Sequence, residues 1–188
     1  NRNKLFRVLG KIKNSKKEKK WLLKKFKEYE IKDRDLSELK IRMDIIPVSL
    51  AIAQAAKETG WGTSRFALEG NALFGQWTFS GEGLKPLAID GNKTHKVMKF
   101  QILQASIRAY QRNLNTHSSY KKFRRLRAVA RENNEKLDSL ILADSLDKYA
   151  ATGAEYTEIL KKIIKQNALK DFDDAKLLPT SEKLKNII

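Results

Sequence analysis

Cysteine is absent from the 188-residue sequence, histidine occurs only twice, and no long apolar run is present. Without cysteine, disulfides, thiolate metal sites and cysteine nucleophiles are excluded. His95 and His117 lie far apart and neither has a partner at metal-ligand spacing, so we expect no metal site and no cofactor. No apolar run approaches the ~20 residues of a membrane-spanning helix, and no signal peptide is recognisable.

Acidic residues are also in short supply, because 39 Lys and Arg stand against 22 Asp and Glu, for a net charge of +17. Residues 1–30 hold twelve basic and three acidic side chains, and residues 120–131 hold six basic side chains and no acid. Such an excess predicts an anionic partner. Nucleic acid, an anionic membrane surface and an anionic cell wall all satisfy it, and the count alone does not choose among them.

The length suits one domain with an appendage. Apolar residues recur at helical spacing on both sides of a polar break at Asn14 and Ser15, with lysine on the other faces. We therefore predict a basic helical N-terminal extension over residues 1–41, a main domain over 42–172 and a loose tail over 173–188.

The chemically informative stretch begins at Pro47, which suits the first position of a helix. Helix-forming residues then continue to Gly60, a residue typical of the position after a helix. On this helix Gln54 and Glu58 are one turn apart and share a face. The helix thus carries a carboxylate in its last turn.

The pattern after this helix predicts a small β lobe and then more helices. Residues 71–75 read as a loop, and two short apolar runs, 87–89 and 97–100, flank an Asp90-Gly91 turn signal. Helical periodicity returns in four segments, residues 103–114, 120–130, 137–146 and 156–164. The sequence therefore predicts a mainly α fold with a β-hairpin lobe.

Glu58 has the physical setting of a proton donor. A carboxylate in the last helical turn faces the negative end of the helix dipole, which favours its protonated form. If Trp61 and Phe66 also keep water away, burial acts in the same direction, and a neutral carboxylic acid is what protonation of a glycosidic oxygen requires. The alternative is a solvent-exposed glutamate that ends an ordinary helix.

Residues 50–67 and 70–77 favour the first interpretation. They read LAIAQAAKETGWGTSRFA and GNALFGQW, which resembles the AQAxxESGWGxSxFA and NNLFG signature of the glucosaminidase family, in particular its Bax-like branch. Lys57 and Thr59 depart from the pattern beside the acid, and Ala72 replaces the second Asn. Further matches lie around Arg108, in residues 112–117 and in residues 148–156, so the resemblance spans about residues 42 to 168.

The resemblance implies a lysozyme-like domain, with a helical part and a β lobe across a substrate cleft. It further implies hydrolysis of the β-1,4 bond after N-acetylglucosamine in peptidoglycan, with Glu58 as general acid. Tyr149 occupies the place of a tyrosine that is important in the family. Its alternative role is a core aromatic that closes a helix.

A second carboxylate is not identified by the sequence. Glu82 and Asp90 both lie in the expected β lobe, where related enzymes place a base or nucleophile. We favour Glu82, because Asp90 already has a structural explanation in its turn with Gly91. Alternatively the N-acetyl group of the substrate serves as nucleophile, and Tyr149 then stabilises the developing charge.

Sugar rings need aromatic platforms and amide or hydroxyl partners, and such side chains are frequent around the signature. The predicted substrate-binding residues are Gln54, Asn71, Phe74, Gln76, Trp77 and Tyr110. Trp61 is assigned to packing and His117 to a structural hydrogen bond at a helix boundary.

The sequence-based hypothesis is therefore an extracytoplasmic endo-beta-N-acetylglucosaminidase that acts as a monomer on peptidoglycan glycan strands. Its basic faces would contact anionic cell-wall polymer, and no nucleic-acid motif is present. A muramidase or lytic transglycosylase on the same fold is the nearest alternative. A non-catalytic module that grips a polyanion through residues 16–27 and 120–131 is the other.

Overall fold

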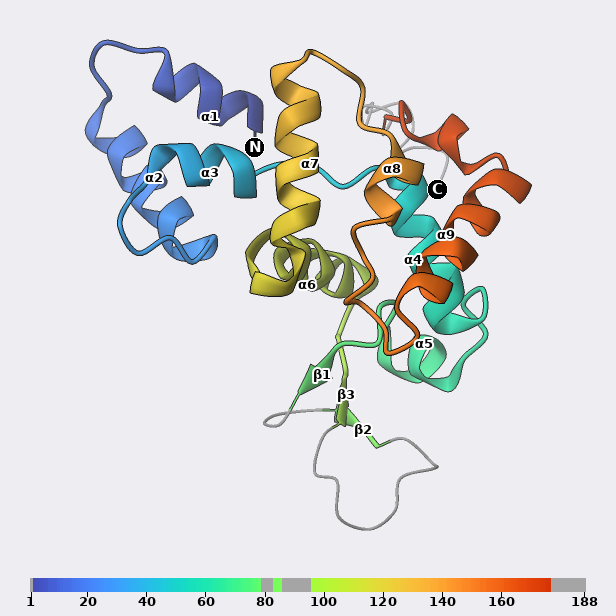
Figure 1. Cartoon of the computed structure of the whole chain (residues 1–188). Coiled ribbons are helices and arrows are strands. Elements are labelled where there is room, and N and C mark those ends of the chain that lie inside the picture. Colours follow the sequence, from blue (N-terminus) through green and yellow to red (C-terminus); the bar gives the residue numbers. More distant parts are fainter. Residues whose placement is uncertain (1, 79–82, 86–95, 177–188) are drawn as a thin grey trace, which may run out of the picture.

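A computed structural model describes residues 2–78, 83–85 and 96–176 of the chain. Within these residues the fold is mainly helical and lysozyme-like, with a small antiparallel sheet (Figure 1). The elements are α1 (Arg2–Leu9), α2 (Lys16–Glu28), α3 (Leu36–Arg42), α4 (Val48–Thr59), α5 (Arg65–Gly70), β1 (Trp77–Thr78), β2 (Gly83–Leu84), β3 (Lys96–Met98), α6 (Leu103–Thr116), a 3-10 turn η1 (Ser118–Tyr120), α7 (Lys121–Glu132), α8 (Ser139–Ala143), α9 (Ala154–Gln166) and a second 3-10 turn η2 (Leu169–Phe172).

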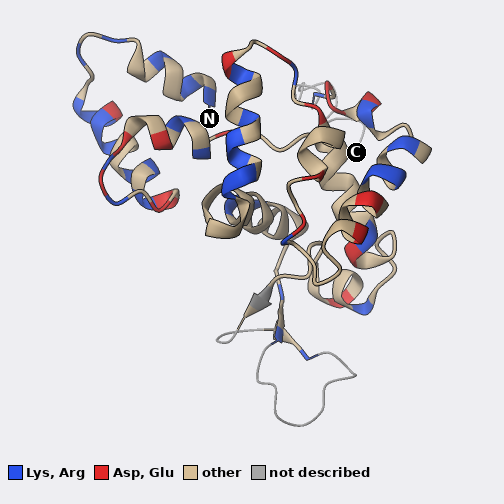
Figure 2. Cartoon of the chain, viewed as in Figure 1, with Lys and Arg blue, Asp and Glu red and all other residues tan. Residues whose placement is uncertain are grey.

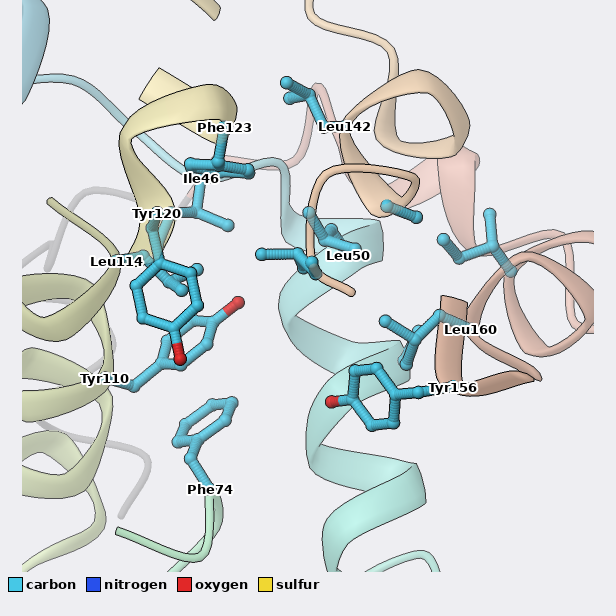
Figure 3. Packing of buried hydrophobic residues seen from close by; sticks show 14 of the residues in the cluster. Ile46, Leu50, Phe74, Tyr110, Leu114, Tyr120, Phe123, Leu142, Tyr156 and Leu160 are labelled. Carbon is cyan, nitrogen blue, oxygen red and sulfur yellow. The ribbon is translucent and has the colours of Figure 1, made fainter. Parts of the chain in front are cut away.

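Helix α4 runs through the main hydrophobic core and packs against α8, α9 and η2. Its buried Leu50 and Ala53 meet the buried faces of the later helices, which include Leu114, Phe123 and Leu160 (Figure 3). The small alanine side chains of α4 let these neighbours approach closely. The helix that carries Glu58 in its last turn is therefore held on several sides by apolar packing.

Helices α1 to α3 enclose a second, smaller apolar cluster, formed by Leu5, Phe26, Ile31, Leu39 and Met43. Ser15 begins α2 with a reciprocal capping box to Glu18, and Asp35 caps the first turn of α3. These three helices lie on one side of α7, and α8 and α9 lie on the other (Figure 1).

A buried carboxylate joins the two clusters. The side chain of Asp44 is 2% exposed and lies within ion-pair distance of three guanidiniums, those of Arg2 at 3.2 Å, Arg131 at 3.1 Å and Arg127 at 3.9 Å. Arg127 is fully buried and donates to the carbonyl oxygens of Ile41 and Ile45 at 3.0 and 2.8 Å. Burial lowers the pKa of Arg127 to about 10, which leaves it charged at neutral pH.

The β lobe projects from the helical body (Figure 1). Its strands have the order β1-β3-β2, and both pairings are antiparallel. A Cβ atom on Gly83 would lie 2.8 Å from the carbonyl oxygen of Val97, so the close approach of β2 to β3 requires glycine there. The expected strand at residues 87–89 and the Asp90-Gly91 turn lie outside the described residues.

The four helices predicted after the lobe are confirmed, as are the two amphipathic helices of the N-terminal region. Pro47 precedes α4 instead of occupying its first position, a shift of one residue. Helices α3 and α5 were not predicted, because seven and six residues are too short to show a clear period.

Replacing Asp44 tests how much stability the buried ion cluster provides. Asp44→Asn leaves the guanidiniums without their carboxylate, so we expect the free energy of unfolding to fall by about 3–5 kcal/mol in urea denaturation. Asp33→Asn, on an exposed side chain, should stay within about 0.5 kcal/mol of the parent. Equal effects of the two substitutions would show that the cluster is not a major source of stability.

Candidate active site

Glu58 lies in the last turn of α4, where three consecutive residues turn the chain sharply. Gly60, Trp61 and Gly62 all have positive φ, at 57°, 60° and 84°. The hydroxyl of Thr59 stabilises this turn by accepting from the backbone N–H of Gly62 at 2.8 Å. The helix therefore stops directly after Glu58, and its C-terminal dipole faces the carboxylate.

The Glu58 carboxylate opens into a groove of about 780 Å³. The groove is bordered by residues 74–76 and Met98 on the side of the β lobe, by Ala109, Arg112, Asn113 and Thr116 of α6, by Glu30 of the N-terminal helices, and by His117, Tyr120 and residues 149–151. A volume of this size lies within the usual range for small-molecule sites. Glu58 and Glu30 are the acidic residues among this described lining.

A chain of buried hydrogen bonds leads to Glu58 from the core. The hydroxyl of Tyr110 donates to Gln54 Oε1 at 2.7 Å, and Gln54 Nε2 donates to the hydroxyl of Tyr156 at 3.0 Å. The Tyr156 hydroxyl in turn donates to Glu58 Oε1 at 3.0 Å. Tyr110, Gln54 and Tyr156 are each at most 1% exposed. Figure 3 shows Tyr110 beside Phe74, with Tyr156 across from them beside α4.

The direction of this chain follows from the charge of Glu58. An ionised carboxylate only accepts, so Tyr156 must give it a proton and use its own oxygen to accept from Gln54. The Gln54 amide then presents its carbonyl oxygen to Tyr110. In this arrangement both polar side-chain atoms of Gln54 and both tyrosine hydroxyls have a partner, and Glu58 Oε1 is occupied as an acceptor.

The other oxygen of Glu58 is the one available for chemistry. Among the described residues Oε2 accepts no hydrogen bond, and it lies beside Gly75, where an added Cβ would be 3.2 Å away. Gly75 also has a φ of 56°, so glycine suits this position for two reasons. When Glu58 is protonated, the acidic proton therefore belongs on Oε2, facing the groove.

Burial raises the pKa of Glu58 above its ordinary value, while the hydrogen bond from Tyr156 and the charge of Lys57 partly oppose the rise. The position at the helix C-terminus acts in the same direction as burial. A carboxyl group with a raised pKa, one fixed oxygen and one free oxygen at a groove can deliver a proton to a bound molecule.

Tyr149 borders the same groove and stacks on Tyr156, with ring centroids 5.5 Å apart and an interplanar angle of 8°. Its hydroxyl donates to the backbone oxygen of Phe74 at 3.1 Å. Burial raises the pKa of Tyr149 well above its ordinary value, so the phenol stays neutral and can act as a hydrogen-bonding group.

Gln54 and Tyr110, which the sequence predicted as substrate contacts, lie in the core. Both side chains are buried, at 0% and 1% exposure, and they support Glu58 from behind. Phe74, at 4% exposure, stacks on Tyr110 with ring centroids 3.8 Å apart, so little of it is exposed to the groove that it borders.

Asn71 and Gln76 take different positions from each other. Asn71 ends α5 with a left-handed conformation and donates to the backbone oxygen of Phe100 at 3.0 Å, so it holds the entry to the β lobe. Gln76 borders the groove, and its buried Oε1 has no hydrogen-bond partner among the described residues. Nothing is described of the Trp77 side chain, and Glu82 and Asp90 lie outside the described residues.

The predicted structural role is wrong for Trp61 and confirmed for His117. Trp61, assigned to packing, is 58% exposed, because the run of left-handed residues turns it outward. His117 has the expected structural role, since its Nδ1 accepts from the backbone N–H of Ser119 at 3.2 Å where α6 ends. The imidazole also borders the groove.

Tyr156, Gly75 and Arg112 are site residues that the sequence did not assign a role. Tyr156 shared a family match, but only the fold shows that it touches Glu58, 98 positions away. Across the described ranges, no three His, Cys, Asp or Glu side chains are grouped as a metal site would require. The described helices also include none that is long and apolar enough to cross a membrane.

Comparison with known proteins gives two matches. The family model for glucosaminidase, described as mannosyl-glycoprotein endo-beta-N-acetylglucosaminidase, matches residues 34–169. Over 126 residues the chain is 33% identical to "Protein bax" of Escherichia coli (strain K12), an alignment that covers 67% of this chain and 44% of that protein. The chain thus spans less than half the length of this relative. No solved structure matches significantly.

The hydrogen bond from Tyr156 gives a direct prediction for the titration of Glu58. The bond stabilises the ionised carboxylate and so lowers its pKa. We therefore expect Tyr156→Phe to raise the Glu58 pKa further, as measured by NMR titration of the labelled side-chain carboxyl. Tyr149→Phe removes a neighbouring hydroxyl that does not touch Glu58 and should leave that titration in place. A lower pKa in Tyr156→Phe would contradict the assigned direction of the bond.

Proposed function

The chain belongs to the glucosaminidase family, in its Bax-like branch, and from this premise we propose that it hydrolyses bacterial cell-wall glycan. The proposed reaction is cleavage of the β-1,4 bond after N-acetylglucosamine in peptidoglycan. Glu58 is the proposed general acid, which protonates the bridging oxygen as the bond breaks.

One observation carries this proposal. Glu58 has one oxygen fixed by Tyr156, its other oxygen accepts no hydrogen bond from the described residues and lies at the groove, and burial raises its pKa. A general acid must be protonated at working pH and must be held at a fixed orientation to its acceptor. The helix end, the buried hydrogen bonds and the glycine at position 75 together supply both conditions.

The group that stabilises the positive charge at the sugar carbon is also a proposal. Glu82 remains our candidate for a second carboxylate, with Asp90 as its alternative. If the N-acetyl group of the substrate serves instead, Tyr149 is a suitable partner for the charge that develops, because its neutral hydroxyl borders the same groove as Glu58.

Sugar hydroxyls need amide and hydroxyl partners, and the groove offers them beside aromatic rings. We propose Gln76, with its unpaired buried oxygen, as a contact for such a hydroxyl, and Tyr120 and Phe74 as apolar contacts for sugar faces. Asn71 and Trp77 stay predicted as substrate contacts. Family membership supports the proposal of an extracytoplasmic location. Action as a monomer stays a prediction.

Fewer basic side chains are available to contact an anionic wall polymer than the sequence indicated. Within residues 120–131, Arg124 and Arg127 are buried, and Arg131 is bound to Asp44. The remaining exposed cations of α7 are Lys121, Lys122 and Arg125 (Figure 2). Structural use of half of this basic segment weakens the alternative of a non-catalytic polyanion-binding module.

Mass spectrometry of digested peptidoglycan tests the proposed reaction. We expect products with N-acetylglucosamine at the reducing end, and a loss of about 100-fold or more in rate for Glu58→Gln. Glu132→Gln, on an exposed glutamate of α7, should keep the parental rate. Products ending in reducing N-acetylmuramic acid or in an anhydro sugar would instead identify a muramidase or a lytic transglycosylase.

Unfolding does not explain the expected loss of activity in Glu58→Gln, because the amide replaces a carboxylate whose charge is disfavoured by burial. With its pKa raised in the fold, Glu58 stabilises the fold most when it is protonated, below its unfolded pKa. That contribution is lost as pH rises through the folded pKa. Glu58→Gln should therefore be at least as stable as the parent at pH 8, by thermal unfolding, and a much less stable variant would void the activity comparison.

A further inference from the structure

The groove that contains Glu58 does not end at the main domain. It reaches Glu30, at the turn between α2 and α3, and a second pocket of about 420 Å³ adjoins it. The two pockets share Ala109 and Arg112 of α6. The second pocket lies between α6 and the end of α2, so one of its walls comes from the N-terminal helices.

This wall is fixed in place by hydrogen bonds to the main domain. Arg42, at the end of α3, donates to the backbone oxygens of Tyr29 and Thr116 at 3.0 and 3.4 Å. Asn115, which also lines the second pocket, donates to the backbone oxygen of Asp44 at 3.1 Å. The two walls of the pocket, from the N-terminal helices and from α6, are therefore held together by hydrogen bonds.

Two arginines give the second pocket its chemistry. Arg108 and Arg112 stand four residues apart on α6 and both line the pocket. Among the described residues Arg108 has no ion pair, and Arg112 has only an exposed one, with Glu30 at 3.2 Å. Such an exposed pair is weak enough for a ligand to replace. Guanidinium groups bind carboxylates in a planar, two-bonded geometry.

Acidic residues at and beside the second pocket argue against a polyanion as its ligand. Glu28 lines the pocket together with the two arginines, and Glu30, which pairs with Arg112, lines the adjoining groove, so both signs of charge meet there. A run of phosphates would be repelled by those carboxylates, whereas a short peptide with both carboxylate and amino groups matches both signs. The ring of Tyr29 adds a half-buried aromatic surface at the same wall.

We propose that this second pocket is a binding site for the stem peptides of peptidoglycan, with Arg108 and Arg112 as the carboxylate contacts. The proposal rests on the proposed function, because the second pocket shares Ala109 and Arg112 with the groove in which the glycan strand is proposed to bind. It adds a substrate class to the site: glycan that still carries peptides.

Hydrolysis of two substrates tests the site. The parent should cleave peptide-bearing peptidoglycan with a higher kcat/KM than the same glycan after its peptides are removed by an amidase. Arg108→Gln should lose about tenfold on the peptide-bearing substrate and little on the stripped one. Arg7→Gln, on the exposed face of α1, is the matched control and should change neither.

Glu30→Gln separates ligand binding from a purely structural role of Arg112. If Arg112 binds a stem carboxylate, removing its competitor should preserve or raise activity on peptide-bearing substrate, whereas Arg112→Gln should lower it. Equal losses in Glu30→Gln and Arg112→Gln would overturn the proposal, since they would show that only the ion pair matters.

The two proposals fail in different ways. No cleavage of either substrate by the parent would refute the hydrolase function. Cleavage of both substrates at equal kcat/KM, or equal losses on both in Arg108→Gln, would refute the peptide site alone. A direct titration with a free stem tetrapeptide, followed by NMR shifts of α6, should saturate in the parent and not in Arg108→Gln.

Discussion

The candidate site depends on a single hydrogen bond between the core and a carboxyl group. Tyr156 holds Glu58 Oε1, and the orientation of Tyr156 is fixed through Gln54 by Tyr110. These three residues are almost completely buried, so their hydrogen bonds are shielded from bulk water. Apolar packing around α4 therefore does more than stabilise the fold. It determines which oxygen of Glu58 can carry a proton toward the groove.

The bond and the burial of Glu58 have opposite effects, and the balance between them matters. Burial favours the protonated acid, and the Tyr156 hydroxyl favours the ionised base. A general acid must give up its proton and later recover it, so a group driven to either extreme would be unsuitable. The Glu58 carboxyl group has a raised pKa and keeps its hydrogen bond from Tyr156 when it is ionised. It can therefore be protonated or ionised without any rearrangement of Tyr156. The same carboxyl could then act as acid and as base in successive steps.

The sequence predicted the parts of this site that depend on local residue spacing. It missed those that depend on how deeply a side chain is buried in the fold. Pro47, the helix-forming residues after it and Gly60 predicted α4, periodicity predicted the later helices, and the family signature singled out Glu58. Helical spacing put Gln54 on the face of Glu58, but it cannot tell that one turn of that face lies in the core and the next at the surface. Trp61 failed for a related reason, because three left-handed residues in succession turn the ring outward, a result no composition rule supplies. The capping residue of α3, Asp35, was visible in the sequence but was not used.

The expected domain boundary at residue 41 remains a prediction. The contacts across it indicate that the N-terminal helices and the main domain form one substrate-facing surface. Asp44 binds arginines from α1 and α7 together, and Arg42 ties the end of α3 both to the α2–α3 turn and to α6. The family match also begins at residue 34, one position before the residue that caps α3. Since Glu30 lines the groove that holds Glu58, the N-terminal helices belong to the surface that a substrate meets. The composition suggested these arginines for anion binding. In the structure they hold that surface in position instead. Part of the +17 charge is thus explained by architecture, and only the exposed remainder needs an anionic partner.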